Sequence, residues 1–215
     1  MIGTIQFVII TTIAMLLYTG GTYQNPSRPG YSFWENFFSD LGLTMAHSGQ
    51  VNTISWFLFT CTAIIIGFCM ILFGLTWISL FQAQRNIYSL SVLGSITLII
   101  SGIGFIGVAL PPADLFLEPH IFFVRIIFVS TFLTSLCYSP ALYLHPSYKK
   151  LYSAIFVGFS GIIFLYLGLL FFGPSSTTME GLLIQATGQK IIGYIMGSVF
   201  FIQGYGAMSL VENKS

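Results

Sequence analysis

The stretch VNTISWFLFTCTAIIIGFCMILFGLTWISLF, residues 51–81, contains no charged side chain and no proline. A transmembrane α-helix needs roughly 20 consecutive apolar residues to cross a hydrocarbon core of about 30 Å. This stretch exceeds that requirement, and its apolar residues do not alternate with polar ones as they do in a membrane β-barrel. Residues 51–81 therefore predict a membrane-spanning helix that tilts in the bilayer or extends beyond it.

The rest of the chain repeats this pattern on both sides of residues 51–81. Only 6% of the residues are charged and 55% are hydrophobic, whereas a soluble domain carries about 25% charged residues. Five further stretches are long and apolar enough to span a membrane: residues 2–19, 89–110, 121–144, 151–173 and 190–210. The sequence predicts an all-α protein, an integral membrane bundle of six transmembrane helices that forms a single domain over residues 1–215.

Basic residues between the predicted spans indicate how the bundle is oriented. An even number of spans places both termini on one side of the membrane. The basic residues on that side are Arg85, Lys149, Lys150 and Lys214, and those on the other side are Arg28 and Lys190. Cytoplasmic loops carry the excess of lysine and arginine. We therefore expect an N-in, C-in arrangement, with the loops after the first, third and fifth spans outside.

Small residues recur at helical spacing on three of the predicted spans. They are Gly94, Thr97, Ser101 and Gly104 on the third span, Gly158, Gly161 and Gly168 on the fifth, and Gly193 and Gly197 on the sixth. Such stripes allow helix backbones to approach each other closely in a membrane. We expect the stripes to pack against other helices of the same chain, and a substrate groove or a homodimer face is the alternative.

The first outer loop, residues 20–50, contains a segment with helical amphipathicity. In residues 33–41 the aromatic and aliphatic side chains fall on one helical face. The polar side chains on the opposite face are Glu35, Asn36, Ser39 and Asp40. Ser32 is suited to cap such a helix and Gly42 to end it, so the pattern predicts a short interfacial helix. Its polar side chains either face water, with the rings as an anchor, or turn inward as a binding face.

The second outer loop brings further ionisable residues to the same side of the membrane. It carries Asp114, Glu118 and His120, and Arg125 follows about one and a half turns into the fourth span. An arginine at this depth is costly unless it is paired or reaches the headgroups. We expect Arg125 to pair with a carboxylate, and we favour Asp40, in a cluster that also includes Asp114 and His120. Snorkelling of Arg125 to the outer headgroups is the alternative.

Four short motifs occur in order along the chain. They are Pro29-Gly30-Tyr31-Ser32, Asn36-x-x-Ser39-Asp40-Leu41-Gly42, Pro112-x-Asp114 followed by His120, and Gly188-Gln189-Lys190-Ile191. With these motifs the chain resembles the prokaryotic multipass family known as domain of unknown function 998. The Ser-Asp-x-Gly element is also distantly similar to the signature of the eukaryotic Frag/DRAM/Sfk multipass proteins, which are linked to lipid organisation and autophagy. The first resemblance implies the six-span fold and a prokaryotic cell membrane, but no particular reaction.

The residues on the outer side suggest a polar pocket at that end of the bundle. We expect it to bind a lipid headgroup or a small anionic ligand, with Arg125 and Lys190 meeting the anionic group. The candidate ligand-binding residues are Asn36, Ser39, Asp40, Asp114, His120, Arg125 and Lys190. Membrane lipids are the expected partners. Another membrane protein, or a second copy of the chain, is a further candidate partner through the small-residue faces.

Two other functions stay open. A membrane-embedded, metal-dependent lipid hydrolase would hold zinc with histidines and an aspartate. His145 falls at the opposite end of the bundle from His47 and His120, however, so the three histidines cannot share one site. A structural accessory subunit would instead use its small-residue faces. We assign no catalytic residue, metal ligand or cofactor, and a formal charge of +1 without a long basic run excludes nucleic acid as an expected partner.

The predicted orientation is tested by cysteine labelling of sealed vesicles. A membrane-impermeant maleimide applied from outside should label the Ser27→Cys and Glu118→Cys proteins, because both positions lie in outer loops. It should leave the Lys149→Cys protein unlabelled until the vesicles are opened. Labelling of Lys149→Cys in sealed vesicles would contradict the N-in, C-in arrangement.

Overall fold

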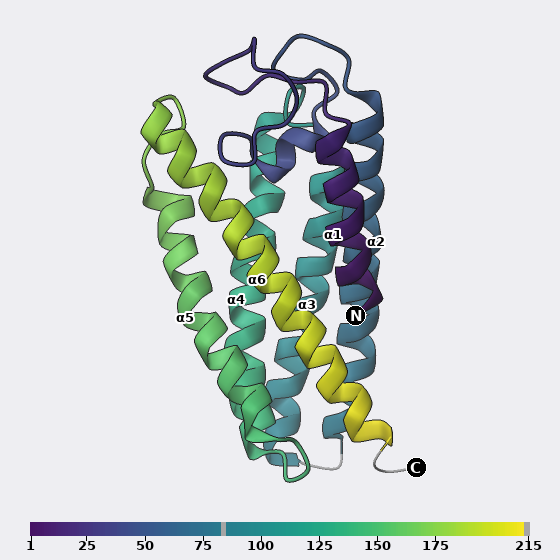
Figure 1. Ribbon diagram of the computed structural model, residues 1–215. Helices are drawn as coiled ribbons and strands as arrows, with labels where there is room; N and C mark the ends of the chain where they lie inside the picture. Colours follow the sequence, from purple (N-terminus) through teal and green to yellow (C-terminus); the bar gives the residue numbers. More distant parts are fainter. Residues whose placement is uncertain (83–84, 213–215) are drawn as a thin grey trace.

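Six α-helices account for most of the residues that the computed structural model describes, which are residues 1–82 and 85–212 (Figure 1). The helices are α1 (Ile2–Leu16), α2 (Thr53–Trp77), α3 (Arg85–Ala109), α4 (Leu117–Leu144), α5 (Lys150–Phe172) and α6 (Met179–Glu212). Two 3-10 helices, η1 (Phe38–Gly42) and η2 (Ile78–Phe81), lie in the first outer loop and directly after α2. The described residues contain no β-strand beyond an isolated bridge between Met45 and Val51. The all-α prediction is confirmed.

Among the described residues, five helices are long and apolar enough to cross a membrane: α2 extended by η2, α3, α4, α5 and α6. The remaining helix, α1, has 15 residues, which at 1.5 Å per residue gives a length of about 22 Å. That length is shorter than a hydrocarbon core of about 30 Å, and α1 starts about halfway along the bundle (Figure 1). The predicted membrane bundle is therefore confirmed, with a first helix shorter than the stretch 2–19.

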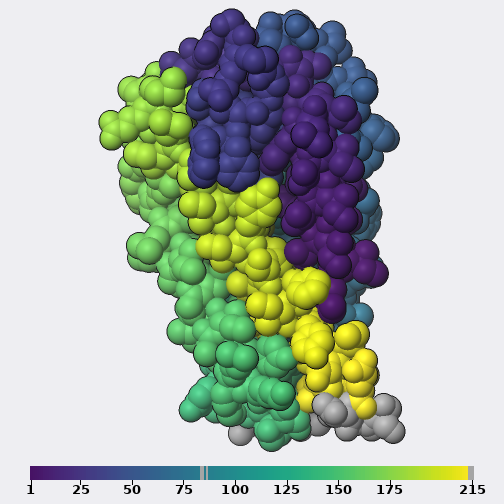
Figure 2. Space-filling view, viewed as in Figure 1, coloured from purple at the N-terminus to yellow at the C-terminus, as the bar shows by residue number. Residues whose placement is uncertain are grey.

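The connecting segments divide between the two ends of the bundle as the sequence predicts. Residues 17–52, 110–116 and 173–178 lie at one end, which we call the outer end (Figure 1). The turn between α4 and α5 and the C-terminal end of α6 lie at the opposite, inner end. The first outer loop, residues 17–52, packs over the outer half of α6 and beside α1 (Figure 2). This loop therefore covers the outer end of the bundle.

Hydroxyl side chains connect α3 to α4 through the membrane interior. The Oγ of Ser101 lies 2.8 Å from the Oγ1 of Thr131, and the Oη of Tyr138 lies 2.6 Å from the Oγ of Ser95. Apolar surface gives two helices little reason to associate in lipid, so such hydrogen bonds and close packing hold the helices together. One further hydroxyl pair, Ser135 with Ser160 at 2.8 Å, ties α4 to α5. Helix α4 is therefore held on two sides.

The predicted small-residue stripes pack within the chain on α3 and α6 but not on α5. A Cβ at Gly94 of α3 would lie 2.6 Å from the ring of Tyr138, and a Cβ at Gly197 of α6 would lie 3.2 Å from Thr4. A Cβ at Gly158, Gly161 or Gly168 of α5 would meet nothing within 4 Å. The expectation of packing within the chain is wrong for α5, because these glycines face away from the bundle.

An aromatic cluster closes the inner end. The ring of Trp77 stacks on Tyr138 at a centroid distance of 3.9 Å, and its Nε1 donates a hydrogen bond to the Oη of Tyr148 at 3.0 Å. His145 uses both ring nitrogens, because Nε2 donates to the carbonyl of Leu80 and Nδ1 accepts from the amide of Ser147. The turn between α4 and α5 is thereby fixed to the end of α2.

A glycine that contacts another helix, Gly94, and a glycine that faces away from the bundle, Gly161, give a direct test of the helix packing. Gly94→Ala should destabilise the protein by about 1–3 kcal/mol, because the new methyl group overlaps the ring of Tyr138. Gly161→Ala should not destabilise the protein, because the new methyl group faces open space and alanine has the higher helix propensity. The measurement is unfolding in mixed micelles with increasing dodecyl sulfate. Equal effects of the two substitutions would contradict this arrangement of α3 and α4.

Candidate functional site

The first outer loop does not form the helix predicted over residues 33–41. Residues 33–35 form a turn, and the helical part is the shorter η1. The backbone amide of Ser32 donates to the Oδ1 of Asn36 at 2.9 Å, and the amide of Phe37 donates to the Oδ2 of Asp40 at 3.0 Å. Asparagine and aspartate side chains compete in this way with regular helical hydrogen bonds. The α-helix predicted over residues 33–41 is therefore wrong, and its helical part is a 3-10 helix that begins at Phe38.

The loop turns two of its predicted polar residues inward. Asn36 and Asp40 are buried, and Ser39 is half-buried, whereas the rings of Phe33 and Trp34 are exposed. This arrangement agrees with the inward-facing alternative for Asn36 and Asp40 and contradicts the interpretation in which they form a solvated face. Hydrogen bonds explain the difference, because the side chains of Asn36 and Asp40 turn inward to bond backbone groups of Ser32, Gly21 and Phe37.

Asp40 accepts three hydrogen bonds at the centre of the loop. Besides the amide of Phe37, its Oδ2 accepts from the Nδ2 of Asn36 at 2.9 Å and lies 3.3 Å from the Nε2 of His47. Asn36 also donates to the carbonyl of Gly21 at 3.0 Å. A buried carboxylate requires such partners, because an uncompensated charge in a low-dielectric environment costs several kcal/mol. Asp40 and Asn36 together hold three separate segments of the loop.

Lys190 of α6 lies directly beneath this loop and is only 1% exposed. Its Nζ donates to the backbone carbonyl of Asn36 and, at 3.3 Å, to that of Ala186. The same Nζ lies 5.5 Å from the ring centroid of Tyr31 and 5.3 Å from that of Phe33, within the range of cation–π attraction. Among the described residues, no carboxylate lies within 4 Å of this ammonium group.

Gln189, the residue before Lys190, provides a second tie between the loop and α6. Its Oε1 accepts a hydrogen bond from the backbone amide of Phe38 at 2.8 Å. The ring of Phe38 packs against Tyr194 and Phe7, at centroid distances of 5.3 and 5.5 Å. The start of η1 is thus held by one polar contact and by rings from α1 and α6. Gln189 belongs to the motif Gly188-Gln189-Lys190-Ile191, so the sequence contained a signal for it.

His47 is the ionisable residue closest to Asp40 that was not included among the candidate residues. Burial lowers the pKa of His47, but the hydrogen bond and charge of Asp40 and the charge of Asp114 outweigh this effect, so the pKa is raised above its usual value. A backbone hydrogen bond from Ser48 to Gly20, at 3.0 Å, brings this part of the loop against residues 20–21. Gly21 has a φ of +83°, and a Cβ there would lie 2.3 Å from the amide nitrogen of Ser48. In the sequence, the Gly20-Gly21 pair was the feature from which this close approach of the His47 segment could have been predicted.

Asp114 joins the second outer loop to the first. Its carboxylate accepts hydrogen bonds from the hydroxyl and the amide of Thr44 and from the amide of Met45, the two amide distances being 3.2 and 3.1 Å. Partial burial raises the pKa of Asp114, but these hydrogen bonds outweigh it and lower the pKa overall. Asp114 is exposed, and its hydrogen bonds hold the second outer loop against the first.

His120 is buried in the first turn of α4, at 4% exposure. Its Nδ1 donates to the carbonyl of Pro111 at 3.1 Å. Its Nε2 has no hydrogen-bond partner among the described residues. The ring therefore holds the loop between α3 and α4 in place. Its Nε2 can still form one hydrogen bond.

The predicted pairing of Arg125 with Asp40 is wrong. The side chain of Arg125 is exposed and lies over the ring of Phe171 on α5, 5.6 Å from its centroid. It makes no ion pair with any described residue. Arg125 and His120 are five positions apart on one helix, which separates their directions by about 140°. Because His120 faces the interior, Arg125 cannot reach the same cluster, and the snorkelling alternative fits its position.

The structure thus brings together only part of the predicted site. Asn36, Asp40 and Lys190 lie together under the first outer loop, with Ser39 beside them on η1. Asp114 and His120 hold the neighbouring loop, and Arg125 lies on the surface between α4 and α5. Among the described residues, no three His, Cys, Asp or Glu side chains are placed to hold a metal ion. The arrangement is therefore a hydrogen-bonded polar cluster, formed by Asn36 and Asp40 of the first outer loop and by Lys190 of α6 beneath it.

Comparison with known proteins identifies the family. A family model described as "Protein of unknown function (DUF998)" matches residues 1–211. The chain belongs to the DUF998 family. No curated protein and no solved structure matches the chain, and the distant similarity to the Frag/DRAM/Sfk proteins gains no support.

The pair of His47 and Asp40 makes the stability of this DUF998 protein depend on pH. Because the folded pKa of His47 is raised, protonated His47 stabilises the folded state. This contribution is fully present below the unfolded pKa of about 6.5 and is lost as the pH rises through the folded value. The melting temperature of the wild type should therefore exceed that of His47→Gln most at about pH 6, with the difference shrinking at alkaline pH.

The matched control for this prediction is the same comparison made in an Asp40→Asn background. Without the carboxylate, the variation with pH of the difference between histidine and glutamine at position 47 should shrink or reverse, because burial lowers the pKa of His47 and only the charge of Asp114 still raises it. A difference that varies equally in both backgrounds would contradict the assignment to Asp40.

Proposed function

We propose that the outer end of this membrane protein binds the anionic headgroup of a membrane lipid, and that Lys190 meets the phosphate. The observation that carries the proposal is the buried ammonium group of Lys190, which has carbonyls and rings around it but no carboxylate within 4 Å among the described residues. Ionisable groups buried in a membrane protein are costly and usually have a functional partner. The charge of Asp40 acts on this lysine from beyond 4 Å, and a phosphate would supply a negative charge in direct contact with it.

Access to Lys190 depends on the turn that covers it. The rings of Tyr31 and Phe33 stand over the ammonium group, and Phe33 is 39% exposed at the surface of the outer end. Movement of the Phe33 ring would uncover the lysine, and a phosphate would replace a cation–π contact by a stronger charge-assisted hydrogen bond. Asn36 and Asp40 would keep the rest of the loop in place while the turn moves.

The other candidate residues take different parts in this proposal. The hydroxyl of Ser39, on the half-buried side of η1, is suited to donate to a headgroup oxygen. Asp114 and His120 position the second outer loop beside the site. Arg125 would contact headgroups separately, from the surface between α4 and α5. The host membrane that we propose is a prokaryotic cell membrane.

A second candidate function is that of an accessory subunit in a membrane complex. Its support is the glycine face of α5, where Gly158, Gly161 and Gly168 have no neighbour within 4 Å. A face of this kind allows a helix from another chain, or from a second copy, to approach closely. The metal-dependent hydrolase gains no such support, since the described residues offer no group of three metal-ligating side chains.

Lipid-dependent thermal stability tests the headgroup proposal. Phosphatidylglycerol added to the detergent-purified protein should raise the melting temperature, because a ligand that binds only the folded state stabilises it. Lys190→Gln should lose most of this increase, and Lys190→Arg should keep it. Phe33→Ala should enlarge the increase, because it removes the ring that covers the ammonium group.

The matched control is Lys149→Gln, an exposed lysine at the inner end, which should leave the increase unchanged. Inorganic phosphate in place of the lipid distinguishes a small-anion site from a headgroup site. A folded Lys190→Gln protein that keeps the full increase would overturn the proposal, as would a Phe33→Ala protein with a smaller increase than the wild type.

A further inference from the structure

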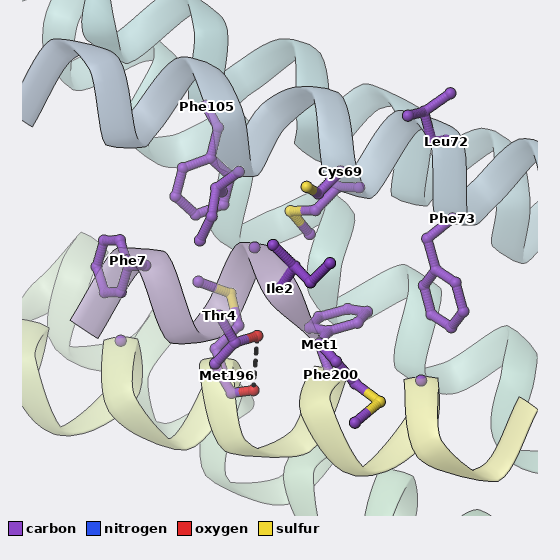
Figure 3. Close-up of a pocket in the computed structure, with 16 residues that line it drawn as sticks. Met1, Ile2, Thr4, Phe7, Cys69, Leu72, Phe73, Phe105, Met196 and Phe200 are labelled. Carbon is purple, nitrogen blue, oxygen red and sulfur yellow. Dashed lines mark hydrogen bonds between the residues drawn. The ribbon is translucent and has the colours of Figure 1, made fainter. Parts of the chain in front are cut away.

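An elongated hollow of about 400 Å³ lies between α1, α2, α3 and α6 (Figure 3). Its walls are mostly apolar and include Phe7 of α1, Cys69 and Phe73 of α2, Phe105 of α3, and Met196 and Phe200 of α6. The hydroxyl of Thr4, which also lines it, donates to the carbonyl of Gly197 at 3.4 Å (Figure 3). The hollow therefore has the lining of a site for an apolar ligand.

The hollow follows α6 along one side. Its lining on α6 runs from Gly193 to Gly204, twelve residues that correspond to about 16 Å along the helix. Cβ atoms at Gly193, Gly197 and Gly204 would meet Phe38, Thr4 and Met1, so these glycines let α1 and η1 pack close to α6 beside the hollow. An apolar site of this length suits a linear chain better than a compact ring system.

The hollow lies near the middle of the predicted spans, where hydrocarbon surrounds the protein. Its α2 residues, from Ile66 to Phe73, lie in the middle of the span Thr53–Phe81. Its α6 residues lie near the middle of Met179–Glu212. At this depth the solvent of the protein is hydrocarbon, and the rim is open beside Leu72, which is 60% exposed. Lipid chains therefore have direct access to the hollow.

We propose that this hollow binds one acyl chain of a membrane phospholipid. The chain would lie along α6 beside Met196 and Phe200 and against the rings of Phe73 and Phe105. An acyl chain in this position gains dispersion contacts with the apolar lining. The inference does not depend on headgroup binding by Lys190, which belongs to the outer end of the bundle and does not line the hollow.

Photocrosslinking tests this proposal. The protein is reconstituted into vesicles of phosphatidylethanolamine and phosphatidylglycerol that contain a phosphatidylcholine with a diazirine in the middle of one acyl chain. After illumination, peptides carrying Cys69, Phe73 and Phe200 should be labelled several-fold more than the lipid-facing peptide around Gly158 of α5. Labelling no stronger than at Gly158 would overturn the proposal, because it would mean ordinary contact with the surrounding lipid.

Two substitutions block the hollow from different sides. A Cβ at Gly204 would lie 3.4 Å from the side chain of Met1, which also lines the hollow, so Gly204→Leu should push that side chain into the hollow. Leu72→Trp fills the rim from α2. Each should reduce labelling of Phe73 and Phe200 several-fold. The matched control is Gly158→Leu, which makes the same change where nothing lies within 4 Å, and it should leave the labelling unchanged.

The crosslinked products also identify other occupants. Lipid attached to the chain at the positions named above supports the proposal. Chain-to-chain adducts formed through these positions with a photoreactive residue at Leu72 would assign the hollow to a second copy instead and overturn it. Unchanged lipid labelling in folded Leu72→Trp and Gly204→Leu proteins would overturn it as well.

Discussion

Lipid offers no hydrogen-bond partner to the polypeptide backbone, and this constraint decides how each part of the protein is built. The helices satisfy their own backbone groups, so they can lie in hydrocarbon without help. The first outer loop is mostly not helical, so its amides and carbonyls need side chains as partners. Asn36 and Asp40 provide them for Ser32, Phe37 and Gly21. The buried polarity of the loop is therefore, first of all, what allows it to fold against the bundle.

The same absence of water changes how the helices associate. Apolar side chains face lipid and protein alike, so they do not select one neighbour over another. Selection comes from hydroxyl pairs such as Ser101 with Thr131, and from glycines that admit a ring, as Gly94 admits Tyr138. Helix α4 makes such contacts with both α3 and α5, which explains its central position in the bundle.

Two features of the molecule suit two different parts of a lipid. The polar cluster under the first outer loop contains the cation Lys190, which has no carboxylate within 4 Å among the described residues. The hollow beside α1 is apolar and lies at the depth of the acyl chains. The two are linked mechanically, since Phe38 of η1 packs on Gly193 and on Phe7, both of which line the hollow.

The sequence by itself determined the membrane bundle and the division of the loops between its two ends, because hydropathy and charge act over short stretches of chain. It did not determine the form of residues 33–41, where side chain to backbone hydrogen bonds replaced the helix that amphipathicity predicted. Nor did it determine the environment of Arg125 or of the α5 glycines. Those depend on which way each helix is rotated. Only the tertiary structure decided that rotation, because contacts between helices distant in sequence fix it and an evenly apolar helix does not record it.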